Sequence, residues 1–453
     1  MKTAGIIAEY NPFHLGHQYQ INYAREIAGA DYIIIAMSGD YVQRGAPALL
    51  PKHIRAEMAL GGGADLVLEL PAAVSTASAE AFARGGVELL DSLNVVDFLC
   101  FGSESGEIEP IRQMAQILTE EPKDYQEKLR DFLKQGMSFP EARSRALLSV
   151  LSRKTRPEAD LNEVNRNANV PFTPASPDLY SQKQQPGIRQ AELQQLETFL
   201  ASPNNILGIE YCKALLKLQS EIRPVTLLRG GNGYHETELS SNQTPSASAV
   251  RKYITEITEQ EPSFDSLEEE LLPYLGKASA GLLASSVKAG GFVTEGQLNL
   301  LLHYCLLTAI REDTLTEYQD MSDALARRIS NTINQYQDFR QYASLLKTRE
   351  ITQTRIQRAL LHVVLRIKAA PAPVGYARVL GFRKNAAPLL SAIKKNGAVP
   401  LITKAADAPG LLTGTALQAF NETVFASNIY ESLLSSRTHN NFRHEYQKPV
   451  VIL

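Results

Sequence analysis

The first hundred residues alternate between short apolar runs and stretches in which apolar residues recur at helical spacing. The runs at 3–8, 31–37, 65–70 and 95–101 are short and rich in β-branched residues, which is typical of buried strands. The helical spacing falls between them, at 15–27, 51–60 and 78–93. This alternation predicts an α/β domain with a doubly wound parallel sheet and right-handed crossovers.

Ligands of such sheets bind beyond the carboxyl ends of the strands. The loops at 9–17, 38–45 and 102–106 are therefore the first places in which to look for a site. In the second of these loops, Gln43 and Arg44 follow a predicted strand. Arg44 is a candidate for a carboxylate or phosphate contact, and a solvated loop arginine is the alternative.

The remainder of the chain is less regular. Residues 107–153 are predicted to be helical, and 154–190 are rich in Asn, Gln, Pro and Ser, as in a polar surface insertion. A strand at 224–228 and a helix at 246–254 follow. Because the pattern is mostly helical from about 262 onward, we expect one domain over 1–260 and a mostly helical C-terminal domain over 261–453.

Composition narrows the class of protein. With 44% hydrophobic and 21% charged residues, the chain is typical of a globular protein, and its longest apolar runs are too short to cross a bilayer. A strand pattern begins at once after Met1, which leaves no room for a signal peptide. The three cysteines form no CxxC pair, which argues against a disulfide framework or a zinc site. We therefore expect a cytoplasmic protein.

The net charge of −3 does not suggest a polyanionic partner, but the distribution of charge does. Residues 347–404 contain twelve Lys or Arg and a single acid, Glu350. Such an excess is expected of a surface that binds nucleic-acid phosphates, and a solvated helix face is the alternative. We predict Arg355, Arg358 and Lys384 as RNA contacts.

The loop after the first strand carries the clearest chemistry. In His14-Leu15-Gly16-His17, two imidazoles lie three residues apart at the start of a predicted helix, on one face of it. The N-terminus of a helix offers free N–H groups and partial positive charge, which favour phosphate. Gly16 lets a nucleotide approach the backbone. A metal pair is less suited to this spacing, because it needs His-x-x-x-His or a third ligand.

A strand followed by His-x-Gly-His resembles the HIGH-motif nucleotidyltransferases, whose fold is Rossmann-like. The segment 246–252, Ser-Ala-Ser-Ala-Val-Arg-Lys, resembles the second motif of that superfamily, a serine-rich turn into a helix with a phosphate-binding basic residue. Further blocks narrow the resemblance to the bacterial tRNA(Met) cytidine acetate ligase (TmcAL) family. These blocks lie at 8–17, 37–45, 64–71, 100–104, 202–211, 354–362 and 378–382.

The resemblance implies a reaction in which acetate and ATP give acetyl-adenylate, and the acetyl group passes to N4 of the wobble cytidine of elongator tRNA(Met). It implies His14 and His17 as catalytic residues, ATP as substrate together with Mg²⁺, and no metal site in the protein. The residues expected at ATP are Ile7, Ala8, Glu9, Tyr10, Asn11, Pro12, Phe13, His14, Leu15, Gly16, His17, Gln18, Tyr19, Gln20, Gly102, Asn205, Arg229, Ser246 and Arg251.

Two other functions share some of these features. A small-molecule adenylyltransferase of cofactor biosynthesis would need the same loop, but not some 200 further residues with a basic segment. A non-catalytic RNA-binding protein could retain an inactive nucleotide fold, although the intact His14, Gly16, His17 and Arg251 argue against it. Pyrophosphate exchange with acetate, with and without tRNA, separates the three.

Overall fold

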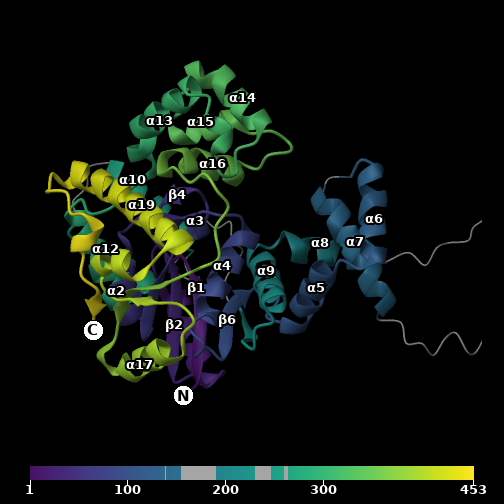
Figure 1. Ribbon diagram of the computed structural model, residues 1–453, viewed down its shortest axis with the longest axis horizontal. Helices are drawn as coiled ribbons and strands as arrows, with labels where there is room; N and C mark the ends of the chain where they lie inside the picture. Colours follow the sequence, from purple (N-terminus) through teal and green to yellow (C-terminus); the bar gives the residue numbers. More distant parts are fainter. Residues whose placement is uncertain (138, 155–189, 230–245, 260–263) are drawn as a thin grey trace, which may run out of the picture. The chain divides into compact units, whose positions relative to one another are not determined.

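The computed structural model describes the whole chain except residues 138, 155–189, 230–245 and 260–263 (Figure 1). Almost all of the predicted insertion at 154–190 lies outside the described residues. The chain forms two compact units, of which the first comprises Met1–Ile108 with Ala214–Leu453 and the second comprises Glu109–Lys213.

The first unit is built on one central sheet with strand order β10-β8-β5-β2-β1-β6-β7, in which β9 also pairs with β8. The neighbours from β5 to β7 are all parallel. These strands are β1 (Thr3–Ala8), β2 (Tyr32–Ser38), β5 (Leu66–Leu70), β6 (Phe98–Ser103), β7 (Arg223–Leu228), β8 (Ala377–Phe382), β9 (Leu401–Ile402) and β10 (Val451–Ile452). A two-stranded ribbon, β3 (Tyr41–Val42) and β4 (Ala46–Pro47), follows β2.

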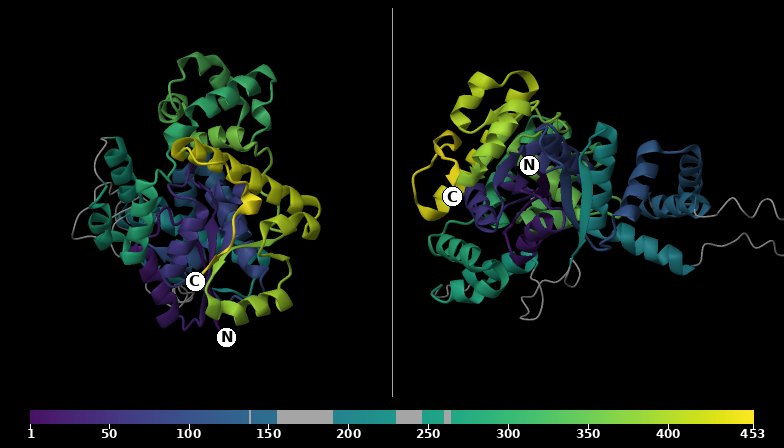
Figure 2. Two further views of the ribbon diagram at one scale, coloured as in Figure 1. Left: turned by 90° about the vertical axis from the view of Figure 1, so that its left-hand side faces the viewer. Right: turned by 90° about the horizontal axis from the view of Figure 1, so that it is seen from below.

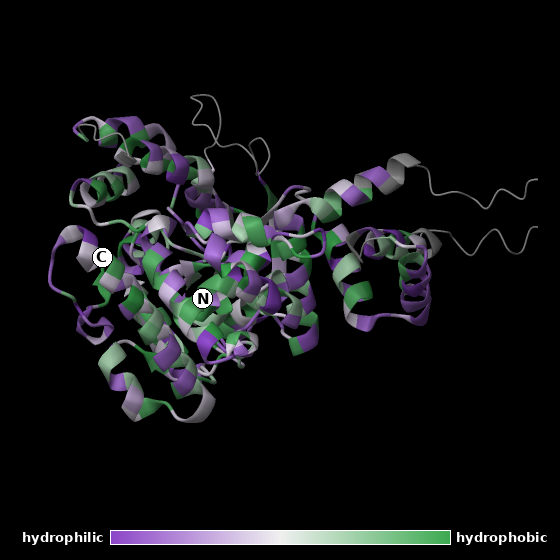
Figure 3. Cartoon of the chain, turned by 90° about the horizontal axis from the view of Figure 1, so that it is seen from above, coloured by the Kyte–Doolittle hydropathy of each residue, from purple (hydrophilic) through white to green (hydrophobic). Residues whose placement is uncertain are grey.

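Helices cover both faces of the sheet, as the views in Figures 1 and 2 show. On one face, Ala4 and Ile6 of β1 join a core that includes Ile21 of helix α1 (Leu15–Glu26). On the other face, Gly5 lies against Leu90 of α4 (Ala79–Asp91). The alternation of side chains along a strand explains this division. Figure 3 shows that the helices carry both hydrophobic and hydrophilic residues.

The remaining helices of the first unit are mostly amphipathic and cover the sheet or form a lobe of their own. They are α2 (Lys52–Gly61), α3 (Ala72–Ser75), α10 (Ala247–Glu259), α11 (Leu267–Leu275), α12 (Lys277–Lys288), α13 (Asn299–Arg311), α14 (Asp323–Thr332), α15 (Phe339–Leu346), α16 (Gln353–Leu365), α17 (Ala387–Asn396), α18 (Ala408–Leu411) and α19 (Gly414–Thr438). The second unit contains α5 (Ile108–Glu120), α6 (Lys123–Lys134), α7 (Phe139–Lys154), α8 (Gln190–Ala201) and most of α9 (Pro203–Leu218). The helical prediction for 107–153 is confirmed.

The sheet differs from the prediction in one respect. The α/β class is confirmed, but the sheet is mixed, because β8 runs antiparallel to β5, with Phe382 opposite Leu66 and Arg378 opposite Glu69. The C-terminal region therefore contributes strands to the same sheet as the N-terminal region. The predicted boundary at residue 260 does not coincide with the division between the two compact units.

Helices α13 to α16 form a lobe beyond the carboxyl ends of the parallel strands, far from the N-terminus in Figure 1. Their shared core also takes in Tyr41, which follows β2, and Ala72, which follows β5. A Cβ atom on Gly45 would lie 2.4 Å from the backbone nitrogen of Arg358, so α16 packs directly on the loop that follows β2. This lobe and the His14 loop therefore lie at the same edge of the sheet.

Candidate active site

The loop between β1 and α1 is held rigidly by its own aromatic residues and by the neighbouring chain. Tyr10 and Phe13 are each 1% exposed and meet edge to face, with ring centroids 4.9 Å apart. Asn11 accepts a 2.8 Å hydrogen bond from the backbone N–H of Leu49 through its side-chain oxygen, and the Asn11–Pro12 peptide is cis. The aromatic packing and the Asn11 hydrogen bond therefore hold the backbone that leads to His14 in place.

His14 and His17 stack on each other, with ring centroids 3.7 Å apart and planes inclined by 29°. His14 is the N-cap of α1, and its Nδ1 accepts a 3.0 Å hydrogen bond from the N–H of Gly16. The Nδ1 of His17 accepts a 3.2 Å hydrogen bond from the N–H of His14. The pair thus closes the first turn of the helix as a reciprocal cap.

Burial and nearby charges determine the charge state of both rings, and the hydrogen bonds at Nδ1 determine the tautomer. Burial, Arg229 and Arg251 lower the pKa of His14 to about 3. Burial, His14 and Arg229 lower the pKa of His17 well below its usual value. Both imidazoles are therefore neutral near pH 7. Because each Nδ1 accepts a hydrogen bond, the proton of each ring is on Nε2, which is left as a hydrogen-bond donor.

The structure corrects one expectation about this helix. The sequence predicts free N–H groups at the N-terminus of α1. The N–H of Gly16 is instead bonded to His14 Nδ1, and the N–H of His17 donates to the carbonyl oxygen of His14 at 2.9 Å. These two backbone amides are therefore not available to an anion at the N-terminus of α1. The groups that can donate to an anion there are the imidazole Nε2–H groups.

The serine-rich motif meets the same loop, although it lies more than 230 residues away in sequence. Ser246 caps α10, and its hydroxyl oxygen accepts a 3.1 Å hydrogen bond from the N–H of Ala249. From the next turn, Arg251 donates to the carbonyl oxygen of Asn11 at 2.6 Å and to the Ser248 hydroxyl at 3.0 Å. These hydrogen bonds hold the guanidinium at the histidine loop, and its charge lowers the pKa of His14.

Gly102 and Arg229 lie together at the carboxyl ends of β6 and β7. A Cβ atom on Gly102 would be 2.8 Å from Cγ of Arg229, so only glycine leaves the arginine in its present position. The N–H of Arg229 donates to the carbonyl oxygen of Ser103 at 3.0 Å and extends the strand pairing. Arg229 also lowers the pKa values of both histidines. Arg229 and Arg251 therefore both oppose protonation of His14, and Arg229 also opposes protonation of His17.

Other predicted residues of the segment 7–20 have mixed roles. The Glu9 carboxylate accepts a 2.9 Å hydrogen bond from the N–H of Gln43, which joins this loop to the one after β2. Gln20 donates to the carbonyl oxygen of Cys100 at 3.0 Å and so ties α1 to β6. Ile7 is a core residue, whereas Tyr19 is 58% exposed.

Two further predicted residues, Asn205 and Arg44, lie outside the segment 7–20. Asn205 belongs to the second unit, where it is buried and donates to the carbonyl oxygen of Phe199 at 3.1 Å. Its contact with ATP stays a prediction. Arg44 is half-buried in the loop after β2 and also has interactions with its surroundings.

Arg55, which was not predicted from sequence, holds together the backbone of the loops that follow β1 and β2. It is 0% exposed and donates to four backbone carbonyl oxygens at the ends of β1, β2 and the following loop. The acceptors are Glu9 at 2.5 Å, Leu50 at 3.0 Å, Ser38 at 3.1 Å, and Gly39. The sequence signal that could have identified it is the presence of two basic residues, Lys52 and Arg55, three positions apart on the buried face of the helix at 51–60.

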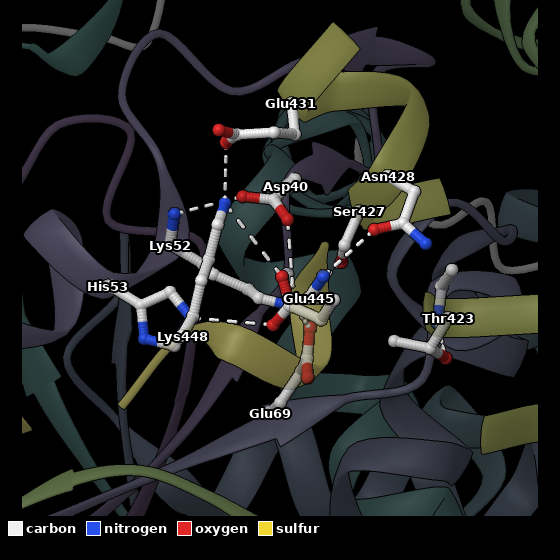
Figure 4. Close-up of polar contacts among 12 residues, drawn as sticks. Asp40, Lys52, His53, Glu69, Thr423, Ser427, Asn428, Glu431, Glu445 and Lys448 are labelled. Atoms are coloured by element: carbon white, nitrogen blue, oxygen red, sulfur yellow. Dashed lines mark hydrogen bonds and ion pairs between the residues drawn. The ribbon is translucent and has the colours of Figure 1, made fainter. Parts of the chain in front are cut away.

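A buried cluster of charges lies near the end of β2 and was also missed (Figure 4). Lys52 Nζ is 2.6 Å from Glu69 Oε1, 2.9 Å from Glu445 Oε1 and 3.6 Å from Asp40 Oδ2. Arg378 bridges Glu69 at 2.6 Å and Glu445 at 2.5 Å. All five of these side chains are at most 4% exposed. Burial and Arg378 oppose the charge of Lys52, but the three acids still raise its pKa.

The cluster connects distant parts of the chain: the loop after β2, helix α2, strands β5 and β8, and the C-terminal segment that carries Glu445. Lys448 extends it, 2.7 Å from Glu431 of α19. Buried charges are tolerated only when paired, so this arrangement fixes how the C-terminal segment returns to the sheet. Its role is structural support of the carboxyl edge.

The three residues predicted to contact RNA do not share one surface. Arg358 is 9% exposed, and its guanidinium donates to Asp320 at 2.8 and 3.4 Å, so we remove it from the candidate RNA surface. Arg355 is more exposed and lies 3.9 Å from Asp320. Lys384 is exposed, but it follows β8, whose end lies beside the start of β5.

Lys384 is consequently at the edge of the sheet opposite to the histidine loop. The same holds for the end of α17, because Asn94, just before β6, donates to the carbonyl oxygen of Asn396 at 2.8 Å. The basic segment 347–404 is therefore divided between the two edges of the sheet. The sequence did not reveal this division, since it depends on the direction of β8.

Neither a metal centre nor a membrane span is found in the part of the chain that the structure describes. No group of three or more His, Cys, Asp or Glu side chains there could hold a metal ion. No helix among those residues has the length and apolar character needed to cross a bilayer.

Known proteins resemble the chain over its whole length. The tRNA(Met) cytidine acetate ligase of Clostridium perfringens is 36% identical over 441 residues, which cover 96% of each chain. That of Acetivibrio thermocellus is 32% identical and covers all of both chains. The crystal structure of Thermotoga maritima TmcAL bound with alpha-thio ATP superposes with a TM-score of 0.81 at 29% identity, over 100% of each chain. Residues 1–445 match the family HIGH Nucleotidyl Transferase. The chain belongs to the HIGH nucleotidyl transferases and, among them, to the tRNA(Met) cytidine acetate ligase family.

Proposed function

We propose that this protein is an ATP-dependent ligase that acetylates N4 of the wobble cytidine of elongator tRNA(Met). The observation that carries the proposal is the convergence of a neutral histidine pair and two arginines, Arg229 and Arg251, at the carboxyl edge of the sheet. Full-length similarity to ligases of this name supports the choice of substrates.

In the first step, a carboxylate oxygen of acetate attacks the α-phosphorus of ATP. The bond from that phosphorus to the bridging oxygen breaks, and pyrophosphate leaves with acetyl-adenylate as the product. Negative charge grows on the non-bridging and leaving oxygens, so fixed donors at those positions lower the barrier.

We assign that task to the Nε2–H groups of His14 and His17. Both rings are held in one tautomer by the backbone, so neither must reorganise during the reaction. Arg229 and Arg251 supply the positive charge that the neutral imidazoles lack. Gly102 keeps Arg229 in place by having no side chain.

Mg²⁺ is expected as a ligand of the triphosphate. The described residues contain no three-ligand cluster that would hold the ion by itself. Mg²⁺ usually binds substrate phosphates and keeps several waters. The ion would therefore arrive with ATP.

In the second step, the cytidine N4 amine attacks the carbonyl carbon of acetyl-adenylate. The bond to the phosphate oxygen breaks, AMP leaves, and N4 loses a proton to give N4-acetylcytidine. Such a reaction belongs in the cytoplasm, where tRNA is available, and no membrane partner is needed.

The test measures the two steps separately. ATP–pyrophosphate exchange should depend on acetate and proceed without tRNA, and labelled acetate should enter elongator tRNA(Met) but not a transcript with uridine at the wobble position. Exchange that ignores acetate, or acetate transfer to neither transcript, would refute the proposal. A small-molecule adenylyltransferase would show exchange with a different acceptor and no labelling of tRNA.

A further inference from the structure

An open hollow in the lobe of α13 to α16 is lined by basic side chains that the sequence analysis did not select. It has a volume of about 720 Å³ and lies between α14 and the segment that leads into α16. Arg327, Arg328 and Asn331 line it from α14. Thr348, Arg349 and Glu350 line it from the facing segment.

The three arginines differ from their neighbours in how their charges are balanced. Elsewhere in this lobe, Arg340 is 2.6 Å from Glu295 and Arg358 is 2.8 Å from Asp320. Within the described residues, Arg327, Arg328 and Arg349 make no ion pair with an acidic side chain. Glu350 is the single acid of the hollow, so the lining carries a net positive charge.

The arginines are also accessible. Arg327, Arg328 and Arg349 are exposed, and Arg328 is positioned by one hydrogen bond of 2.9 Å to the carbonyl oxygen of Leu345. None of the three guanidinium groups has its charge balanced by an ion pair within the described residues. They are well suited to phosphate, which they can bind through two parallel hydrogen bonds.

The hollow is on the reactive side of the molecule. Helix α16 packs on the loop after β2, and His362 of this helix lies 3.1 Å from the carbonyl oxygen of Thr76, which follows β5. Both contacts are at the carboxyl edge of the sheet, where the histidine pair lies. A long ligand that reaches the histidine pair can therefore also extend over this lobe.

We infer that this arginine hollow binds backbone phosphates of the tRNA at a distance from the reacting cytidine. The inference rests on the proposed function and replaces Arg358 and Lys384 as RNA contacts. An extended polyanion fits an open, exposed surface better than a small anion does, because a small anion needs an enclosing site. Asn331 and Thr348 add uncharged hydrogen-bonding groups suited to ribose hydroxyls.

The test compares two double variants that each remove two positive charges. Arg327→Ala with Arg349→Ala changes the hollow and keeps the Arg328 contact with Leu345. Lys394→Ala with Lys395→Ala is the matched control on α17, because both lysines are exposed and α17 ends at the opposite edge. Binding of labelled tRNA is measured by filter binding between about 0.05 and 0.3 M salt. Pyrophosphate exchange without tRNA reports on the fold.

Each phosphate contact contributes a slope of about −0.7 to −0.9 to log K against log salt. Loss of two contacts should flatten the slope by about 1.4 to 1.8, which corresponds to about 15- to 30-fold weaker binding at 0.15 M salt. The control should bind as the wild type does, and exchange should be unchanged in both variants.

Equal binding by the hollow variant and the control would overturn the inference, as would equal weakening by both. Either result would leave the proposed function intact if the wild type still acetylates tRNA. A wild type that neither binds nor acetylates tRNA would overturn the proposed function itself.

Discussion

Replacement of His14 by Asn and by Ala separates its two roles. The Nδ1 of His14 caps α1 by accepting from Gly16, whereas its Nε2–H is the group that we assign to phosphate. The Oδ1 of Asn occupies nearly the position of Nδ1, so His14→Asn keeps the cap and removes the donor. His14→Ala removes both.

The magnitudes follow from these contacts. Loss of one donor to a developing oxyanion raises a barrier by about 2 to 4 kcal/mol, or about 30- to 1,000-fold in rate. Both variants should lose pyrophosphate exchange by that factor. Loss of an N-cap costs about 1 kcal/mol, so only His14→Ala should lose this additional amount of folding stability.

The assays are acetate-dependent pyrophosphate exchange and urea unfolding followed by far-ultraviolet circular dichroism. The chain has no tryptophan, so its intrinsic fluorescence is a weak probe. An Asn variant that keeps wild-type exchange would refute the donor role of Nε2–H. An Ala variant as stable as the Asn variant would refute the cap.

Three further outcomes are expected. Because the folded-state pKa of His14 is about 3, below that of an unfolded histidine, the unfolded state takes up the proton first as pH falls below 6.5. Titration of His14 should therefore lower the free energy of unfolding by about 2 kcal/mol between pH 8 and pH 5. In His14→Asn, the free energy of unfolding should fall by about 2 kcal/mol less over the same pH range than in the wild type. Glu445→Ala should lower the free energy of unfolding in urea by about 3 to 5 kcal/mol, because it removes a partner of the buried Lys52 and Arg378. Lys404→Ala, which breaks the exposed pair of Lys404 with Asp407, should lower it by less than about 0.5 kcal/mol. Similar losses in the two variants would mean that the buried cluster is not stabilising. Gly102→Ala should displace Arg229 and raise the KM for ATP roughly tenfold with the fold retained, and an unchanged KM would contradict that positioning role.

Local patterns were sufficient for most of the elements in the first hundred residues. The strands at 3–8 and 65–70 and the helix from Leu15 were predicted within one or two residues, because the period of apolar positions is set by contiguous residues. The position of the His-x-Gly-His loop after β1 followed for the same reason. The meeting of Arg251 with that loop was predicted only through the family resemblance.

The succession of elements and the chemistry of the loop after β1 could be predicted from sequence, because each depends on residues that are neighbours in the chain. The direction of β8, which puts Lys384 at the far edge, and the pairing of Arg358 with Asp320 depend on contacts between distant segments. Tertiary structure also decided the buried cluster, in which Lys52 meets Glu445 and Arg378 meets Glu69, each more than 300 residues away in sequence. The burial and charge state of a side chain depend on such distant partners, and no local pattern records them.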